Sequence, residues 1–514
     1  MKKLSYLVMV CLNLNVLAQD VQQSYIQTDK NVDNCGFAGV IGSTFYTVTR
    51  DKKAKEAGYS INSNSCETME MKESKVIVND GVKMGSDNWK IVKLDDRLVL
   101  IVTVWKRDAP NEIYAKVIVN SNNEINAAGP LTLIKEWESP VYNGKKLTLG
   151  SEIFIVGPQS SDPGNKALVY YKKDRPFSVK DYDLKTDILS FVLIDKDLKV
   201  FDDKITDFEG ENIPLAEPLL DPKGNFYVLP KSGILGMYSN AEAINSGYVF
   251  CYNSGKKSMM KKKDIFKASF KNGEIASSIQ DARVKADGTL VYTGFYDPQP
   301  GSTNQGGLYI AELNMNSAPG VFHAPLSDKV FTRKYVSEKK NVANYGGILD
   351  AFIAGDRVVV QQRTVGLDKK GITLESVGMD YALFTKDANA GYTYGKTYSC
   401  NVGMYKTTKT LRMSTRDAIS LAPLFMEDGN KLQMVFLLQK EGFGYDKLDV
   451  KPKAYYAVVM NTFGADGEMT TKYLYDLDPT QKGGPSPDES VKTGAHSWLI
   501  TESSFRGFPV KLTF

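Results

Sequence analysis

The feature that most constrains this chain is a turn followed by a short apolar strand, recurring at nearly regular intervals. Each turn is rich in Asp, Gly or Asn, and each following run is rich in Val, Ile, Leu, Tyr and Phe. The turns begin near residues 95, 151, 221, 287, 356, 428 and 496, so successive turns are 56 to 72 residues apart. A spacing this regular is typical of a repeat architecture.

A second apolar run follows each of these strands and indicates what the repeating unit is. Examples lie at residues 113–119, 248–252, 308–313 and 455–460. These runs are β-branched and aromatic, and they are too short for a pair of amphipathic helices. Two clear strands, with room for two weaker ones, favour a four-stranded blade. The sequence therefore predicts an all-β propeller, most simply of seven blades, with six to eight possible.

The two ends of the chain are expected to complete this ring. Few residues follow the last turn, whereas an N-terminal strand pair at 37–48 and 59–69 has no phased turn strand of its own. Joining these halves in one blade would close the ring with strands from both termini, and closure removes exposed sheet edges. An eight-bladed ring and two smaller β domains are the alternatives.

Over nearly the whole mature chain, this pattern resembles β-propeller proteins in general. The chain lacks the Gly-His and Trp-Asp pairing of WD40 repeats, and Gly346-Gly347 is a single glycine pair of the kelch kind. The resemblance therefore extends to the architecture alone and implies no functional residues.

The N-terminus has the form of an export signal. Residues 1–18 combine Lys2 and Lys3, an apolar stretch at 4–14 and a plausible cleavage site after Ala18. The apolar stretch is shorter than the ~20 residues of a membrane-spanning helix, which favours a cleaved signal, and an uncleaved anchor is the alternative. The leader resembles those of exported bacterial proteins. We expect residues 19–514 to form a single propeller domain in the periplasm, at the outer membrane or outside the cell, without a transmembrane segment.

Four cysteines remain after cleavage, and in an exported chain they permit disulfides. A bond between Cys35 and Cys66 would close the shortest loop, and both residues fall in what we interpret as adjacent strands. Four buried thiols are the alternative, because a fold of this size needs no covalent staple. No Cys-x-x-Cys occurs and no histidine lies near a cysteine, so the sequence indicates no metal site.

Composition and turn chemistry together disfavour most catalytic interpretations. The net charge is +4 and the only histidines are His323 and His496, which argues against nucleic-acid binding and most His-based sites. A glycosidase would need two carboxylates in the central channel. The candidates are Asp95, Asp221, Asp287, Asp356 and Asp428. Each lies where a turn favours Asp in any case, because the carboxylate bonds nearby backbone N–H groups. We therefore name no catalytic residue and no cofactor.

Three further motifs are better explained as turns or solvated loops. Residues 160–164 resemble the front of a sialidase-type Asp box, but Ala167 stands at its aromatic position. The acidic residues between Asp195 and Asp203 lack the ligand spacing of a calcium loop. The lysine-rich run at 256–263 could bind a polyanion, although such runs also guard exposed sheet edges.

Aromatic residues beside glycines are the best candidates for recognition. Phe295 and Tyr296 follow Gly294, and Phe443 and Tyr445 flank Gly444, in what we interpret as loops. Rings with polar tips suit stacking on sugars or burial at a protein interface. The sequence thus favours an exported, non-enzymatic binding or scaffold protein of the bacterial envelope, engaging a protein or glycan partner. The alternatives are a carbohydrate-active enzyme with channel carboxylates and a propeller with a small molecule on its axis.

Overall fold

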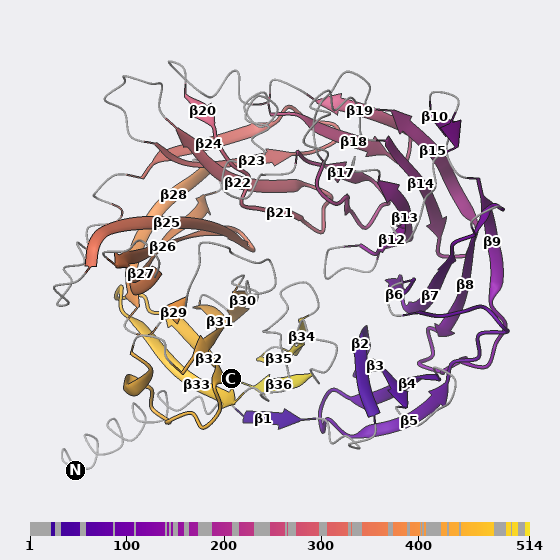
Figure 1. Ribbon diagram of the computed structural model, residues 1–514, viewed down its shortest axis with the longest axis horizontal. Coiled ribbons are helices and arrows are strands. Elements are labelled where there is room, and N and C mark those ends of the chain that lie inside the picture. The colour runs from indigo at the N-terminus through magenta and orange to yellow at the C-terminus, as the bar shows by residue number, and fades with distance from the viewer. Residues whose placement is uncertain are drawn as a thin grey trace, which may run out of the picture.

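The computed structural model of this protein is a ring of β-sheets around a central axis (Figure 1). It describes residues 22–25, 32–51, 58–85, 88–106, 109–138, 141–142, 145–146, 153–158, 164–172, 188–207, 215–230, 247–262, 265, 274–297, 306–326, 330, 342–368, 374–387, 391–400, 402, 406–407, 423–428, 431–440, 444–476, 490–494, 496–501 and 509–513. The leader at 1–18 lies outside these residues, and so do residues 160–163 of the Asp-box-like motif.

Blades 1 to 4 each contain four antiparallel strands in chain order. Blade 1 contains β2 (Val32–Ile41), β3 (Thr44–Asp51), β4 (Tyr59–Ser65) and β5 (Met71–Val76). Blade 2 contains β6 (Trp89–Leu94), β7 (Arg97–Val104), β8 (Asn111–Val119) and β9 (Thr132–Trp137). Blade 3 contains β12 (Ile153–Val156), β13 (Lys166–Lys172), β14 (Ile188–Asp195) and β15 (Val200–Asp207). Blade 4 contains β16 (Leu219–Leu220), β17 (Phe226–Val228), β18 (Val249–Asn253) and β19 (Ser258–Lys262).

Blades 5 to 7 follow the same plan with small additions. In blade 5, β20 (Ile275–Ala276) and β21 (Asp281–Val284) both pair with β22 (Leu290–Asp297), followed by β23 (Gly307–Leu313) and β24 (Gly320–Pro325). Blade 6 contains β25 (Val342–Ala354), β26 (Arg357–Asp368), β27 (Leu374–Asp387) and β28 (Gly391–Cys400), with β29 (Lys406–Thr407) pairing to β27. Blade 7 contains β30 (Leu424–Asp428), β31 (Lys431–Gln439), β32 (Tyr456–Phe463) and β33 (Met469–Asp476).

Blade 8 is built from both ends of the chain. It contains β34 (Val491–Gly494), β35 (Ser497–Ile500) and β36 (Val510–Thr513), and its outer strand is β1 (Gln22–Tyr25). The register pairs Gln22 with Thr513 and Tyr25 with Val510. A separate short hairpin of β10 (Val141–Tyr142) and β11 (Lys145–Lys146) lies between blades 2 and 3 in the chain. The all-β propeller and its closure by both termini are thereby confirmed.

The predicted count of seven blades is wrong by one, because no phased turn signal marks the first hairpin of blade 1. The seven counted turns belong to blades 2 to 8. Six of them join the first strand of a blade to the second, whereas the one near residue 151 precedes β12, the first strand of blade 3, which leaves the count unchanged. The corresponding hairpin of blade 1 is Gly42-Ser43, where Gly42 has a φ of 57° and no acidic residue marks the turn. The N-terminal strand pair therefore belongs to a complete blade of its own, and β1 supplies the closing strand.

Alternating side chains on the second strand of each blade hold neighbouring blades together. On β7, Leu98, Leu100 and Val102 pack against blade 1, whereas Val99 and Ile101 pack against blade 3. All five are fully buried. Burying one such side chain contributes about 1.5–3 kcal/mol. These apolar layers fix the blades, and the blades in turn fix the loops at the two ends of the ring. In the described part of the chain, no helix has the length and apolarity of a membrane span.

Candidate binding site

The two ends of the ring can be named from strand direction. We call the end at which the first strand of each blade begins the top face, and the end that carries the hairpin between first and second strands the bottom face. Because neighbouring strands are antiparallel, the connection between the second and third strands and the end of the fourth strand also lie on the top face.

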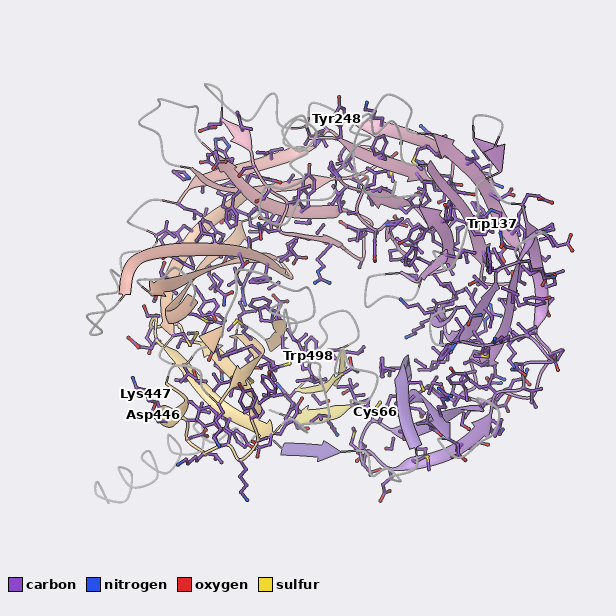
Figure 2. All side chains as sticks on the ribbon, viewed as in Figure 1. Cys66, Trp137, Tyr248, Asp446, Lys447 and Trp498 are labelled. Carbon is purple, nitrogen blue, oxygen red and sulfur yellow. The ribbon has the colours of Figure 1, made fainter. Side chains whose placement is uncertain are left out.

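Three of the chain's four tryptophans lie at the top end of blade 2. Trp89 begins β6, Trp105 follows the last residue of β7, and Trp137 ends β9. The register confirms this placement, because Trp89 is opposite Val102 and Trp137 is opposite Asn111. Trp137 is buried, toward the outer side of the ring in Figure 2, whereas Trp105 remains 45% exposed. Exposed tryptophan is common where a protein surface is used for binding.

A polar network anchors the loop that carries Trp105. The backbone N–H of Lys106 donates to the side-chain Oδ1 of the buried Asn111 (3.2 Å), and the Lys106 ammonium forms an ion pair with Glu112. The Tyr114 hydroxyl donates to the same carboxylate (3.0 Å). The hydrogen bond from Lys106 lowers the pKa of Glu112, so this carboxylate is ionised at neutral pH. The network presents Trp105 on a fixed backbone.

A hollow of about 230 Å³ lies between blades 2, 3 and 4, where their first strands begin. It is lined by Trp89, Lys90, Ile153, Phe154, Ile155, Val156, Tyr170 and Glu217. The Phe154 side chain is 43% exposed, and its ring stacks on the buried ring of Tyr170 with centroids 5.4 Å apart. Lys90 and Glu217 are exposed and lie on blade 2 and just before β16 of blade 4.

The lining of this hollow combines apolar surface with a few polar groups. It offers aromatic and aliphatic surface with one ammonium and one carboxylate, the pattern of a small recognition pocket. Glycoside hydrolysis uses two carboxylates close together, and among the described lining residues Glu217 is the one carboxylate. Among the described residues, no group of His, Cys, Asp and Glu could hold a metal ion.

The aspartates considered for the channel instead lie at the bottom face, in the first hairpins of five different blades. Asp221 is buried and accepts hydrogen bonds from the backbone N–H groups of Lys223 (2.8 Å) and Asn225 (2.7 Å). Asp95 pairs with Lys196 of blade 3 (3.0 Å). These carboxylates cap turns and link blades, as their turn positions predicted.

Asp287 and Asp356 follow the same pattern in the next two blades. The Asp287 carboxylate accepts from the N–H of Thr289 in its own turn (2.8 Å), and Asp356 of blade 6 pairs with Lys285 of blade 5 (2.7 Å). The bond from Lys285 lowers the pKa of Asp356. The side chain of Asp428, at the end of β30, lies outside the described residues.

The aromatic residues beside Gly294 lie in a strand and not in the predicted loop. Phe295 and Tyr296 lie within β22, and Tyr296 is 2% exposed with its ring edge on His323, centroids 5.7 Å apart. Burial raises the pKa of Tyr296 to about 12. A Cβ on Gly294 would meet the backbone oxygen of Ser278 at 1.9 Å, so this glycine serves a close approach within the sheet and not a turn.

Tyr445 begins the short 3-10 helix η2 (Tyr445–Lys447), whose Asp446 and Lys447 are labelled in Figure 2. It is buried and donates its hydroxyl to the backbone oxygen of Pro452 (2.9 Å). Phe443 lies outside the described residues. The role of these four aromatics in binding stays a prediction.

The cysteines are thiols and not disulfides in the structure. Cys35 lies in β2 and Cys66 follows β4, and β3 lies between these two strands. The prediction that the two cysteines fall in adjacent strands is therefore wrong. Cys35 packs with the residues between blades 1 and 2, whereas Cys66 packs with those between blades 8 and 1. The two side chains therefore belong to opposite faces of one sheet.

Side chains of the lysine-rich run and of the acidic turn make contacts with nearby residues. Lys257 donates to the backbone oxygen of Phe201 (2.6 Å) and lies over its ring, and Lys261 lies 4.1 Å from the ring centroid of Tyr248. Tyr248 lies at the edge of the ring of blades in Figure 2. Asp195 accepts from the backbone N–H groups of Asp197 and Lys199 (both 2.9 Å), as in an ordinary turn.

The tryptophan-rich end of blade 2 is not among the sites that the sequence predicted. The available signal was the restriction of three of the four tryptophans to residues 89–137. A search for rings beside glycines passes over it, because Trp89 and Trp137 lie at strand ends without a glycine next to them.

Comparison with known proteins adds similarity of fold. No family model matches the chain, and no curated protein matches it. The WD40 domain of SCAP from fission yeast is 11% identical with a TM-score of 0.39, covering 96% of this chain and 98% of that one. The polysaccharide lyase Uly1 is 8% identical with a TM-score of 0.36, covering 95% and 92%. The β-propeller domain of the Trilobed protease from Pyrococcus furiosus is 10% identical with a TM-score of 0.30, covering 71% and 98%. At these values the similarities carry no argument about function.

Proposed function

We propose that this protein is a non-enzymatic binding module of the bacterial cell envelope, exported through the leader at 1–18. It engages a protein or glycan partner through the top face of blades 2 and 3. The observation that supports this most is Trp105, a residue left 45% exposed on an anchored loop, at the end of blade 2 that also carries Trp89 and Trp137. Leaving a large ring in water forgoes hydrophobic stabilisation, which binding of a partner would recover.

The hollow beside Trp89 supports the same face. Phe154 is exposed there although it lies on a first strand, where its neighbours Ile153 and Tyr170 are buried. A carbohydrate-active enzyme is the weaker candidate, because the hollow offers a single carboxylate and the turn aspartates are engaged at the opposite face.

The test is partner capture from envelope extracts and binding to a glycan array, each compared between the native protein and Trp105→Ala. Because Trp105 is half in solvent, we expect folding to be unchanged and binding to weaken about tenfold or more. Tyr394→Ala is the matched control, since Tyr394 is similarly exposed (41%) but lies in blade 6. Equal binding by all three proteins would contradict the proposal.

Export is tested separately by cell fractionation. The native chain should appear in the envelope or medium, and a variant lacking residues 2–18 should remain in the cytoplasm. Retention of the native chain in the cytoplasm would contradict this part of the proposal.

A further inference from the structure

The rings that wall the hollow are held in place before any ligand arrives. Phe154 is stacked on Tyr170 at an interplanar angle of 26°, so one of its faces is covered and the ring cannot turn freely. Trp89 donates its indole N–H to the backbone oxygen of Gly85 (2.8 Å) and packs edge-on against Tyr59, with centroids 5.0 Å apart. A preorganised wall of this kind reduces the ordering cost of binding.

The volume limits what can enter. Pockets for drug-sized ligands usually enclose about 300–1,000 Å³, whereas this hollow encloses about 230 Å³. It therefore has room for one ring-sized group, with the remainder of a larger ligand outside.

The lining of the hollow contains two side chains of opposite charge. Lys90 comes from blade 2 and Glu217 from the segment before β16 of blade 4. An ammonium only donates hydrogen bonds and a carboxylate only accepts them. A ring that carries hydroxyl groups can both accept from Lys90 and donate to Glu217, while its C–H face lies on the phenyl ring of Phe154. An apolar side chain could use Phe154 but neither charged group.

We propose that this hollow is a subsite for a single neutral pyranose ring of a glycan. This rests on the proposed function and names the partner chemistry of that same face. Phe154 supplies the stacking surface, Glu217 accepts hydroxyl protons, and Lys90 donates to hydroxyl oxygens. The positive charge of Lys90 and the negative charge of Glu217 offset each other, so the lining is close to neutral. A neutral lining suits an uncharged sugar better than an acidic one.

The experiment uses the methyl glycosides of glucose, galactose, mannose and N-acetylglucosamine as probes of the full-length protein. Binding is followed by saturation-transfer NMR and by the change in tryptophan fluorescence. We expect millimolar binding of at least one probe, about tenfold weaker in Phe154→Ala and several-fold weaker in Glu217→Gln. Phe154→Tyr should retain binding, and Tyr394→Ala should leave it unchanged. Thermal melting of each variant checks that the fold is intact, and Glu217→Gln provides a test on an exposed side chain.

The outcomes separate this inference from the function on which it rests. Failure of all four probes to bind, or equal binding by Phe154→Ala, overturns the sugar subsite. If Trp105→Ala still abolishes capture of a partner in that case, the binding function stands without it. Loss of protein capture in Phe154→Ala without any sugar binding would assign the hollow to an apolar side chain and likewise overturn the inference.

Discussion

The two faces of blade 8 differ sharply in what they bury. Toward blade 7, Ile500, Val510 and Leu512 join an extensive apolar cluster that also draws on blade 6, and we call this the apolar seam. Toward blade 1, the described residues form a smaller cluster, and we call this the closing seam. It contains Phe45, Cys66, Met69 and Leu499, with the partly buried Phe37 and Val40 packed against them. Figure 2 labels Cys66 on the blade 1 side. The amount of apolar packing between neighbouring blades therefore differs between the two sides of blade 8.

Strand alternation accounts for the difference. Along β36, Val510 and Leu512 point into the apolar seam, so Lys511 and Thr513 point the other way. The Lys511 ammonium donates to the backbone oxygen of Glu67 in blade 1 (2.9 Å). One sheet therefore presents an apolar side to blade 7 and a largely polar side to blade 1.

The face of blade 1 that packs against blade 8 also carries buried polar side chains. Thr47 and Asn62 are cross-strand partners on the same side as Phe45, and Asn64 lies opposite Phe45. Asn64 Nδ2 donates to the Thr47 hydroxyl (3.4 Å), while its Oδ1 is buried and has no hydrogen-bond partner among the described residues. An unsatisfied buried oxygen weakens an interface by about 1–3 kcal/mol. The comparison teaches that ring closure in this protein relies on β1–β36 pairing more than on apolar packing.

The largest expected effect contrasts leucine truncation in the two seams. Leu512 in the apolar seam and Leu499 in the closing seam are both fully buried residues of blade 8. Leu512→Ala should lower the free energy of unfolding by about 4 kcal/mol, and Leu499→Ala by about 2 kcal/mol, because the smaller cluster collapses more readily around the cavity. Urea denaturation measures both. Equal losses would remove the distinction between the seams.

The second prediction uses the thiols as reporters of local opening. Burial raises the pKa of Cys66 and of Cys400, and both side chains are buried, so alkylation of either requires the seam around it to open. At pH 8 we expect Cys66 in the closing seam to react about tenfold faster than Cys400, which lies where the apolar cluster joins blades 6 and 7, a difference of about 1.4 kcal/mol in opening. Peptide mapping by mass spectrometry resolves the two sites.

A chain that starts after Tyr25 provides the control for this measurement. It lacks β1, so labelling of Cys66 should accelerate while Cys400 stays at its original rate. Faster labelling of Cys400 than of Cys66 in the native protein would show that the closing seam is the tighter one.

The smallest expected effect comes from making the closing seam more apolar. The double variant Thr47→Val with Asn64→Leu removes both partners of a weak hydrogen bond together with the unsatisfied oxygen, and should raise the free energy of unfolding by about 1 kcal/mol. Thr47→Val alone is the matched control, because it removes an acceptor of Asn64 and should destabilise. A double variant less stable than the native chain would show that these polar groups hold the seam.

Strand patterns in the sequence were sufficient for the fold class and the closure, but not for the phase of each blade. The turns at Asp95 and Asp221 join first to second strands, whereas the similar turn near Ser151 precedes a first strand. Periodicity reports that strands recur, and it does not report which strand of a blade a given turn follows. Gly42-Ser43 escaped notice because a two-residue hairpin needs a glycine at positive φ but no aspartate.

The candidate site could not be predicted from the sequence for a related reason. Trp89, Phe154 and Glu217 come from three blades, and they meet only because each lies near the start of a first strand. An error of one strand in phase moves a residue to the other end of the blade. Gly294 shows the opposite case. It lies between Thr293 and Phe295 at a close approach within the sheet, where the glycine beside a ring had indicated a loop.

The pairing of β1 with β36 also sets the order of events when the chain folds. Residues 22–25 and their hydrogen-bonding partners at 510–513 are separated by nearly the whole of the described chain. Blades 1 to 7 contain all of their own strands and can form from local contacts, but blade 8 depends on a pairing of very high contact order. The polypeptide is therefore expected to remain an open arc until this long-range step joins β1 to β36 and makes it a ring.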